Sequence, residues 1–223
     1  MKIAFLGDAA LLVTLADAPG ETASAAVHAL AAAVSDAHIA GVRALVPAYT
    51  TLLVHVEPLL VDLQHVADAL AALLPQSVPP LRRRWHLPVR YDGADLPHVA
   101  KTLGLSVNRV IDLHATAEYA VACLGFAPGF AYLTGLPPAL HIPRRASPRP
   151  QIAAGSLILG GQQTAVMPLA MPSGWHLLGR TAVALFDLTQ EIPCLLQPGD
   201  RVVFVPTDSA ALASALPRCE ALP

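Results

Sequence analysis

The sequence is poor in cysteine and in charge, and each shortage removes a class of protein. It has three cysteines in 223 residues and no CxxC pair, so nothing indicates a disulfide framework or a zinc site. Charged residues make up 13% and the formal net charge is -2, so the basic domain that binds nucleic acid or anionic membranes is absent. The N-terminal apolar run is interrupted at Asp8, and no long uncharged apolar stretch follows. We expect a cytoplasmic protein without a signal peptide or membrane span.

Several catalytic motifs are also missing. The nine histidines form no HxH, HxxxH or HExxH pair, so no metal site is expected. Ser156 is not part of a G-x-S-x-G elbow and is interpreted as a hydroxyl at the start of a strand. No Walker A loop occurs. These absences argue against a metalloenzyme, a serine hydrolase and a P-loop ATPase.

Apolar residues are abundant, at 54% of the sequence with a mean hydropathy of +0.53. This is high for a soluble monomer and favours a partner that covers apolar surface.

The most distinctive stretch runs from Gly125 to Thr181. Eight of the 14 glycines fall there, with many prolines, which excludes a long helix and uninterrupted strands. It also contains four arginines and no Asp, Glu or Lys. We expect an anion, or a carboxylate from elsewhere in the fold or from a partner, to bind these guanidinium groups.

Hydrophobic periodicity predicts an α+β arrangement for the N-terminal part. The expected order is two strands, a helix, two strands and a helix, at residues 2–6, 10–15, 21–36, 42–46, 51–56 and 63–74. With a further strand near Arg83 to Leu87, the order is that of a ferredoxin-like unit. The boundary is expected at Pro75 to Pro80, which gives domains at residues 1–80 and 81–223.

The C-terminal part is expected to be a β-rich barrel or sandwich with minor helices. Asp95 is predicted to cap one short helix and Ser106 another, which ends near His114. Strands are predicted at residues 156–159, 164–167, 182–186 and 201–206, with a turn at Pro198-Gly199-Asp200 before the last. The Ala-rich tail from Ser209 to Pro223 is interpreted as a frayed helix.

Several residues admit two interpretations. The Gly160-Gly161 pair is either an anion-binding nest or a tight turn. His114 is either structural or a general acid–base. The run from Arg82 to Trp85 is interpreted as a solvated strand end rather than a phosphate patch. Four aromatic side chains either form a pocket wall or pack in a core, namely Phe126, Phe130, Tyr132 and Trp175.

Long ordered motifs then make the sequence similar to one family. They are GFAPGFAYLTGL, PRRASPR, AAGSLILGGQQT, PSGWHLLGRT, LFD and LLQPGDRVVFVP. On these motifs the chain resembles the B subunit of bacterial ATP-dependent 5-oxoprolinase, a group that includes Kip-type inhibitors of a histidine kinase and proteins labelled allophanate hydrolase subunit 1. The resemblance covers nearly the whole length.

The resemblance implies a small α+β N-terminal domain, here ferredoxin-like, and a cyclophilin-like β-barrel. It implies two partners, a homologous C subunit and an A subunit, with which the family cleaves 5-oxo-L-proline to L-glutamate using ATP. ATP, with Mg²⁺, is expected at the level of the complex, and the isolated chain is expected to be inactive. The alternatives are a Kip-type inhibitor of a sensor histidine kinase and a component of a urea or allophanate pathway.

The family's pocket pattern, carried over to this sequence, gives three groups of site residues. His114 is the candidate catalytic residue. Substrate or anion binding is implied for Phe126, Phe130, Arg144, Arg149, Gln163, Thr164, Trp175 and Arg180. Backbone loop roles are implied for Gly125, Pro128, Gly129, Gly160, Gly161 and Gly174.

Three departures from the family's pattern bear on the substrate. Met167 stands where the family usually has Tyr, and Ser173 replaces the first glycine of a Gly-Gly-Trp. The third departure is Pro150-Gln151-Ile152-Ala153, in place of a run that contains Val-Pro.

Overall fold

The computed structural model describes residues 1–73, 83–212 and 215–222. The chain divides into two compact units, Met1–Pro80 and Leu81–Pro223. The predicted boundary at Pro75 to Pro80 lies outside the described residues.

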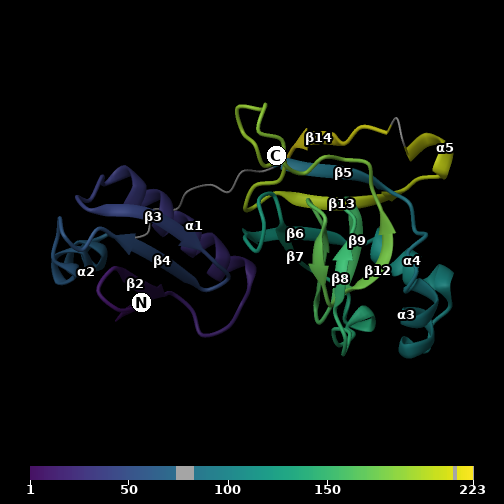
Figure 1. Ribbon diagram of the computed structural model, residues 1–223, viewed down its shortest axis with the longest axis horizontal. Coiled ribbons are helices and arrows are strands. Elements are labelled where there is room, and N and C mark those ends of the chain that lie inside the picture. The colour runs from purple at the N-terminus through teal and green to yellow at the C-terminus, as the bar shows by residue number, and fades with distance from the viewer. Residues whose placement is uncertain (74–82, 213–214, 223) are drawn as a thin grey trace. The chain divides into compact units, whose positions relative to one another are not determined.

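The first unit is a four-stranded antiparallel sheet with two helices (Figure 1). Its elements are β1 (Lys2–Phe5), β2 (Ala10–Thr14), α1 (Glu21–Asp36), β3 (Val42–Pro47), β4 (Thr51–Val56) and α2 (Leu63–Ala72). The strand order is β1-β2-β4-β3. Alternate residues of β2 and β4 pack with Val27, Leu30 and Val66 of the helices in one core. The periodicity therefore predicted every element of this unit.

The second unit is built on an eight-stranded sheet. Its elements are β5 (Arg83–Val89), α3 (Leu96–Leu103), α4 (Val107–Ala115), β6 (Glu118–Leu124), β7 (Ala131–Thr134), the 3₁₀ helix η1 (Pro138–Leu140), β8 (Arg149–Ile152), β9 (Ser156–Gly160), β10 (Gln163–Val166), β11 (Met171–Ser173), β12 (His176–Arg180), β13 (Arg201–Pro206), α5 (Ser209–Leu212) and β14 (Arg218–Ala221). The strand order is β12-β9-β10-β7-β6-β13-β5-β14. The pair β5–β13 is parallel and the other pairs are antiparallel.

The segment that follows β5 makes backbone contacts with β12, which is the edge strand at the opposite side of the sheet from β14. Arg90 and Arg180 exchange two backbone hydrogen bonds of 2.8 Å. Gly93 and Gly179 permit this approach, because a Cβ at either position would collide with backbone atoms across the contact. The sheet therefore curves around one core that includes Leu87, Leu159 and Phe204.

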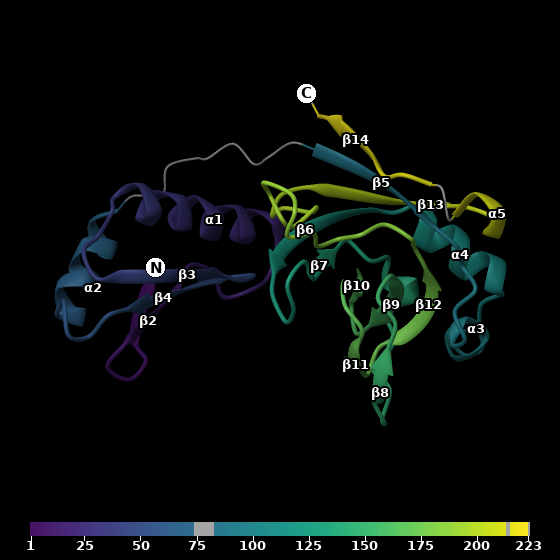
Figure 2. The ribbon, with the colours of Figure 1, turned by 45° about the horizontal axis from the view of Figure 1, so that its top comes forward.

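A second apolar cluster lies on the other side of β9 and β10. Leu157 and Leu159 face the main core, whereas Ile158 belongs to the second cluster, as the alternation of a strand requires. The two-stranded sheet of β8 and β11 lies beside these strands (Figure 2) and contributes Ile152 to this cluster. This second cluster forms the base of the candidate site.

The structure corrects the expected ferredoxin-like order. The strand near Arg83 to Leu87 is β5, which pairs with β13 and β14 of the second unit. The edge position beside β2 is taken by β1, which precedes it in the chain. The pattern of β5 identified a strand but carried no information about its partners.

Two other segments differ from the prediction. Residues 182–186 form no strand, although Phe186 makes a single bridge to Cys194. The tail is not one frayed helix, because Arg218–Ala221 forms β14 along β5. The Ala-rich composition of the tail does not reveal that this segment pairs with a neighbouring strand.

Candidate functional site

The candidate site is a pocket of about 250 Å³ on the second apolar cluster. Its walls come from the loops after β6 and before β8 and from strands β7, β9 and β11. The lining residues are Phe126, Phe130, Tyr132, Arg144, Arg145, Pro148, Ile158, Met167, Pro172, Ser173, Gly174 and Trp175. Sites for drug-sized ligands span roughly 300–1,000 Å³, so this pocket suits a smaller molecule.

Phe130 is the centre of the aromatic wall. Its ring meets Tyr132, Phe126 and Trp175 edge to face, with centroids 4.9, 5.3 and 6.2 Å apart. Such contacts order the rings beyond what apolar burial alone achieves. Gly160 admits the indole of Trp175, since a Cβ there would lie 2.8 Å from the ring. The aromatic residues thus serve both predicted purposes, as core packing and as a pocket wall.

Arg144 carries the charge of this pocket. Its guanidinium carbon lies 5.5 Å from the centre of the Trp175 ring. Its side chain is exposed, and no carboxylate among the residues that the structure describes pairs with it. A guanidinium in this position can bind an anion in the pocket.

Arg145 and Arg149 are held by Asp95. Arg149 donates two hydrogen bonds to the carboxylate, at 2.7 and 2.8 Å, and Arg145 donates one at 3.2 Å. Asp95 also accepts from the Leu177 amide at 2.8 Å. Burial would raise the pKa of Asp95, but the hydrogen bonds from Arg149 and Leu177 outweigh it and lower that pKa. Asp95 does not cap α3 with its side chain, and Arg149 does not line the pocket.

Arg180 is likewise bound within the protein. Its Nη2 lies 2.9 Å from the carboxylate of Asp92, which Arg90 also contacts at 3.2 Å. One of the predicted partners for the arginine-rich stretch was a carboxylate from elsewhere in the fold. This is confirmed for Arg145, Arg149 and Arg180. Of the four arginines, Arg144 lines the pocket without a carboxylate partner among the described residues, whereas Arg145 lines it while paired with Asp95.

His114, the candidate catalytic residue, has no exposed surface. Its Nε2 lies 2.8 Å from Thr164 Oγ1, and that hydroxyl donates to the Ile158 carbonyl at 2.9 Å. The hydroxyl therefore accepts the Nε2 proton, and the bare Nδ1 accepts from the Tyr91 hydroxyl at 2.8 Å. Both ring nitrogens are used inside the core, so the structure supports the structural interpretation of His114 and places Thr164 away from the pocket.

Burial lowers the pKa of His114 from 6.5 to about 3. Between these values the unfolded chain binds a proton that the folded chain does not, so the free energy of unfolding should fall as the pH falls. The slope should approach about 1.4 kcal/mol per pH unit. Urea unfolding from pH 7 to pH 4 should show this slope in wild type, and His114→Gln should reduce it. The exposed His98→Gln is the control, and equal slopes in all three proteins would refute the buried neutral state.

The Gly160-Gly161 pair is a tight turn. Gly160 and Gln163 face each other as the last and first residues of β9 and β10, and Gly161 has φ 65°. The Gly161 amide donates to the Ile142 carbonyl at 2.7 Å. That amide is not free to bind an anion, so the structure favours the tight-turn interpretation over the nest. Ser156 opens β9 as predicted, with its hydroxyl on the Ala153 carbonyl.

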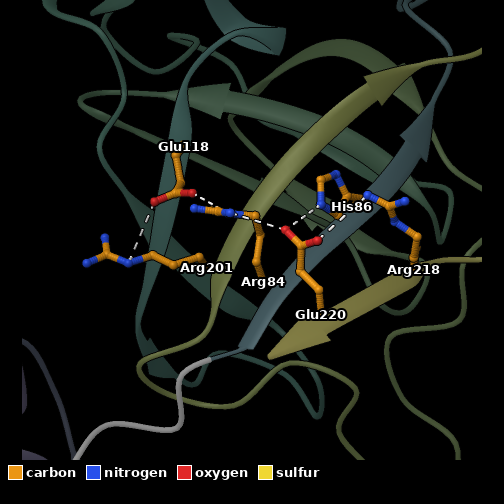
Figure 3. A network of polar contacts seen from close by, with 6 residues as sticks. All are labelled: Arg84, His86, Glu118, Arg201, Arg218 and Glu220. Carbon is orange, nitrogen blue, oxygen red and sulfur yellow. Dashed lines mark hydrogen bonds and ion pairs between the residues drawn. The ribbon is translucent and has the colours of Figure 1, made fainter. Parts of the chain in front are cut away.

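Arg82 of the predicted basic run lies outside the described residues. The described arginines at the start of β5 are ion-paired within the fold and do not form a solvated strand end, and Figure 3 shows the network around Arg84. Arg84 lies 2.6 Å from Glu118 and 3.1 Å from Glu220. Arg83 binds the buried carboxylate of Asp200 at 2.8 and 2.9 Å. His86, Arg201 and Arg218 complete the network in Figure 3. These contacts join β5, β6, β13 and β14.

The pocket thus gathers part of the predicted set. It contains Phe126, Phe130, Arg144, Gly174 and Trp175, but Gln163, Gly125, Pro128, Gly129, Gly160 and Gly161 do not line it. Met167 and Ser173, two of the departures from the family's pattern, do line it. Three further residues that line the pocket were not among the predicted site residues: Arg145, Ile158 and Pro172. For Ile158, alternation along β9 was an available signal, since its neighbours face the main core.

Among the described residues, no group of three or more His, Cys, Asp or Glu side chains could hold a metal ion. Within the same part of the chain, no helix has the length and apolar character needed to cross a membrane.

Comparison with known proteins decides the family. The family model for the carboxyltransferase domain, subdomains C and D, matches residues 1–196. The 5-oxoprolinase B subunit of Bacillus subtilis (strain 168) is 37% identical over 221 residues, which cover 92% of both chains. This chain belongs to the family of 5-oxoprolinase B subunits. The B subunit of Escherichia coli O157:H7 is 51% identical over 134 residues, 59% of this chain and 62% of that protein. The latter match spans less than two thirds of the relative.

Two solved structures have folds similar to that of this chain. TTHA0988 is similar with a TM-score of 0.82 and 38% identity, over 90% of this chain and 40% of that one. Urea carboxylase of Kluyveromyces lactis has a TM-score of 0.78 at 17% identity, over 98% of this chain and 23% of that one, and so supports the fold alone. The chain has a mixed α/β fold with large sheets, similar to carboxyltransferase and urea carboxylase domains.

Proposed function

We propose that this chain is the B subunit of an ATP-dependent 5-oxoprolinase, which hydrolyses 5-oxo-L-proline to L-glutamate together with the A and C subunits in the cytoplasm. The observation that carries the proposal is the full-length similarity to a protein named as the B subunit of 5-oxoprolinase. The pocket supports it through its size and its charge.

5-Oxo-L-proline is a small ring with one carboxylate and a planar amide. In the proposed complex the carboxylate binds Arg144, and the ring lies against the aromatic wall around Phe130. Arg145 adds a second donor beside the pocket, because its buried Nε has no hydrogen-bond partner among the described residues. A small aromatic pocket with few charged groups fixes the orientation of such a ligand.

The chain's part in catalysis is to position the lactam. An amide is a poor electrophile, and phosphoryl transfer from ATP to the lactam oxygen activates it for ring opening by water. We assign ATP and Mg²⁺ to the complex rather than to this chain, since the sequence has no P-loop and the Gly160-Gly161 turn is used internally. No nucleophile from this chain is required.

We also infer the finer description of the two units. The order β1-β2-β4-β3 with two helices supports a ferredoxin-like unit in which β1 takes the last strand's place. The curved eight-stranded sheet, joined through Arg90 and Arg180, supports a cyclophilin-like barrel.

Reconstitution tests the proposed function. The A and C subunits mixed with this chain should release ADP and glutamate in proportion to 5-oxo-L-proline consumed, and omission of the chain should abolish glutamate formation. Full activity of the other two subunits without the chain would contradict the proposal.

A further inference from the structure

Phe126 has a backbone conformation that a phenylalanine rarely adopts. Its φ is 69°, and the Ala127 amide donates to the Gly125 carbonyl at 2.8 Å, which closes a three-residue γ-turn around it. Turns of this hand are rare and strained, and a bulky residue at positive φ is an outlier. The strain is confined to position 126, since Gly125 does not have a positive φ.

Stability does not explain the side chain at this position. The side chain of Phe126 is 60% exposed, whereas Phe130 in the same loop is 3% exposed. The rings of Phe126 and Phe130 lie edge to face with centroids 5.3 Å apart, and Phe126 lines the pocket. A glycine at position 126 would adopt φ 69° without strain.

The loop holds this exposed ring in a fixed place. The Gly125 amide donates to the Phe130 carbonyl at 3.1 Å, and the Phe130 amide donates to the Ala127 carbonyl at 3.0 Å. Gly129, at φ 77°, lies so close to Leu185 and Phe186 that a Cβ would be 2.7 Å from the Phe186 Cβ. The strain is therefore stored in a well-braced loop, and such strain is found at ligand sites.

We infer that Phe126 is the specificity-determining wall of the pocket, which covers the apolar face of a small ring-shaped carboxylic acid whose carboxylate binds Arg144. This rests on the proposed function in so far as 5-oxo-L-proline is the natural ligand of that class. The ring acts on the ligand ring, and it has no role in binding the carboxylate.

The test uses Phe126→Gly, which removes the ring and the strain together, with Phe126→Ala as the variant that keeps the strain. Calorimetric titration of the full chain would use 5-oxo-L-proline, cyclopentanecarboxylate and acetate. Phe126→Gly should weaken both ring acids about tenfold, leave acetate unchanged, and unfold at an equal or higher urea concentration than wild type.

The inference is overturned if the ring acids bind Phe126→Gly as tightly as wild type, or if acetate loses as much affinity as the ring acids do. It is also overturned if none of the three acids binds wild type. A fourth contrary result would be that Phe126→Gly unfolds at a lower urea concentration than Phe126→Ala. The proposed function fails separately: it is contradicted if cyclopentanecarboxylate binds in a Phe126-dependent way while 5-oxo-L-proline neither binds nor turns over in the reconstituted complex.

Discussion

Asp95→Asn should lower the free energy of unfolding of the second unit by about 3 kcal/mol, at the lower end of the cost of breaking a buried ion pair. The carboxylate is 7% exposed and accepts from Arg145, Arg149 and the Leu177 amide. The asparagine keeps the shape but loses the charge, so it leaves two guanidinium groups without a counter-ion. Because these arginines are 25–30% exposed, water recovers part of the loss.

Urea unfolding followed by tryptophan fluorescence measures this effect. Asp112→Asn, on the exposed side of α4, is the matched control and should change stability by less than about 0.5 kcal/mol. A loss below about 1 kcal/mol in Asp95→Asn would mean that the ion pair is worth no more than a surface one.

Arg144→Ala should raise the KM for 5-oxo-L-proline in the reconstituted complex by about 10- to 100-fold. A hydrogen bond to a charged group contributes about 1.5–3 kcal/mol, and Arg144 has no carboxylate partner among the described residues to share it with. In the proposed complex Arg144 binds the carboxylate and not the reacting amide, so kcat should change much less than KM.

Steady-state ADP release with each variant measures both constants. Arg109→Ala, an exposed arginine of α4, should leave both unchanged, and Arg144→Lys should recover part of the affinity. A large fall in kcat with unchanged KM would assign Arg144 to the reaction itself.

Local patterns predicted the elements of the fold well because they depend on neighbours in sequence. The stripe of Val27, Leu30 and Val34 identified α1, and alternation identified β4 with its observed bounds. The same patterns could not assign β5 to the second unit, because its partner β13 lies more than a hundred residues away in the sequence. Each segment has the pattern of an ordinary strand, which does not identify the strand that it pairs with.

The site was predicted only in part, because local patterns mark its residues but do not show their contacts with residues distant in sequence. The concentration of arginine, glycine and aromatic residues after Leu124 marked the pocket. The roles of the arginines depend on contacts over fifty residues or more, such as Arg149 with Asp95, and Asp95 stands where a capping residue would stand. His114 could be taken for a catalytic histidine until its contacts with Tyr91 and Thr164 were known.

The proposed function requires that this chain supply the pocket in which Arg144 binds the carboxylate of a lactam acid. The most direct measurement compares the affinities of 5-oxo-L-proline and 2-pyrrolidinone, the same lactam without the carboxylate, for complexes that contain wild-type or Arg144→Ala chain. The complex with wild-type chain should prefer 5-oxo-L-proline at least tenfold, and the complex with Arg144→Ala should lose this preference. An equal preference in both complexes would place carboxylate recognition elsewhere and contradict the role proposed for Arg144.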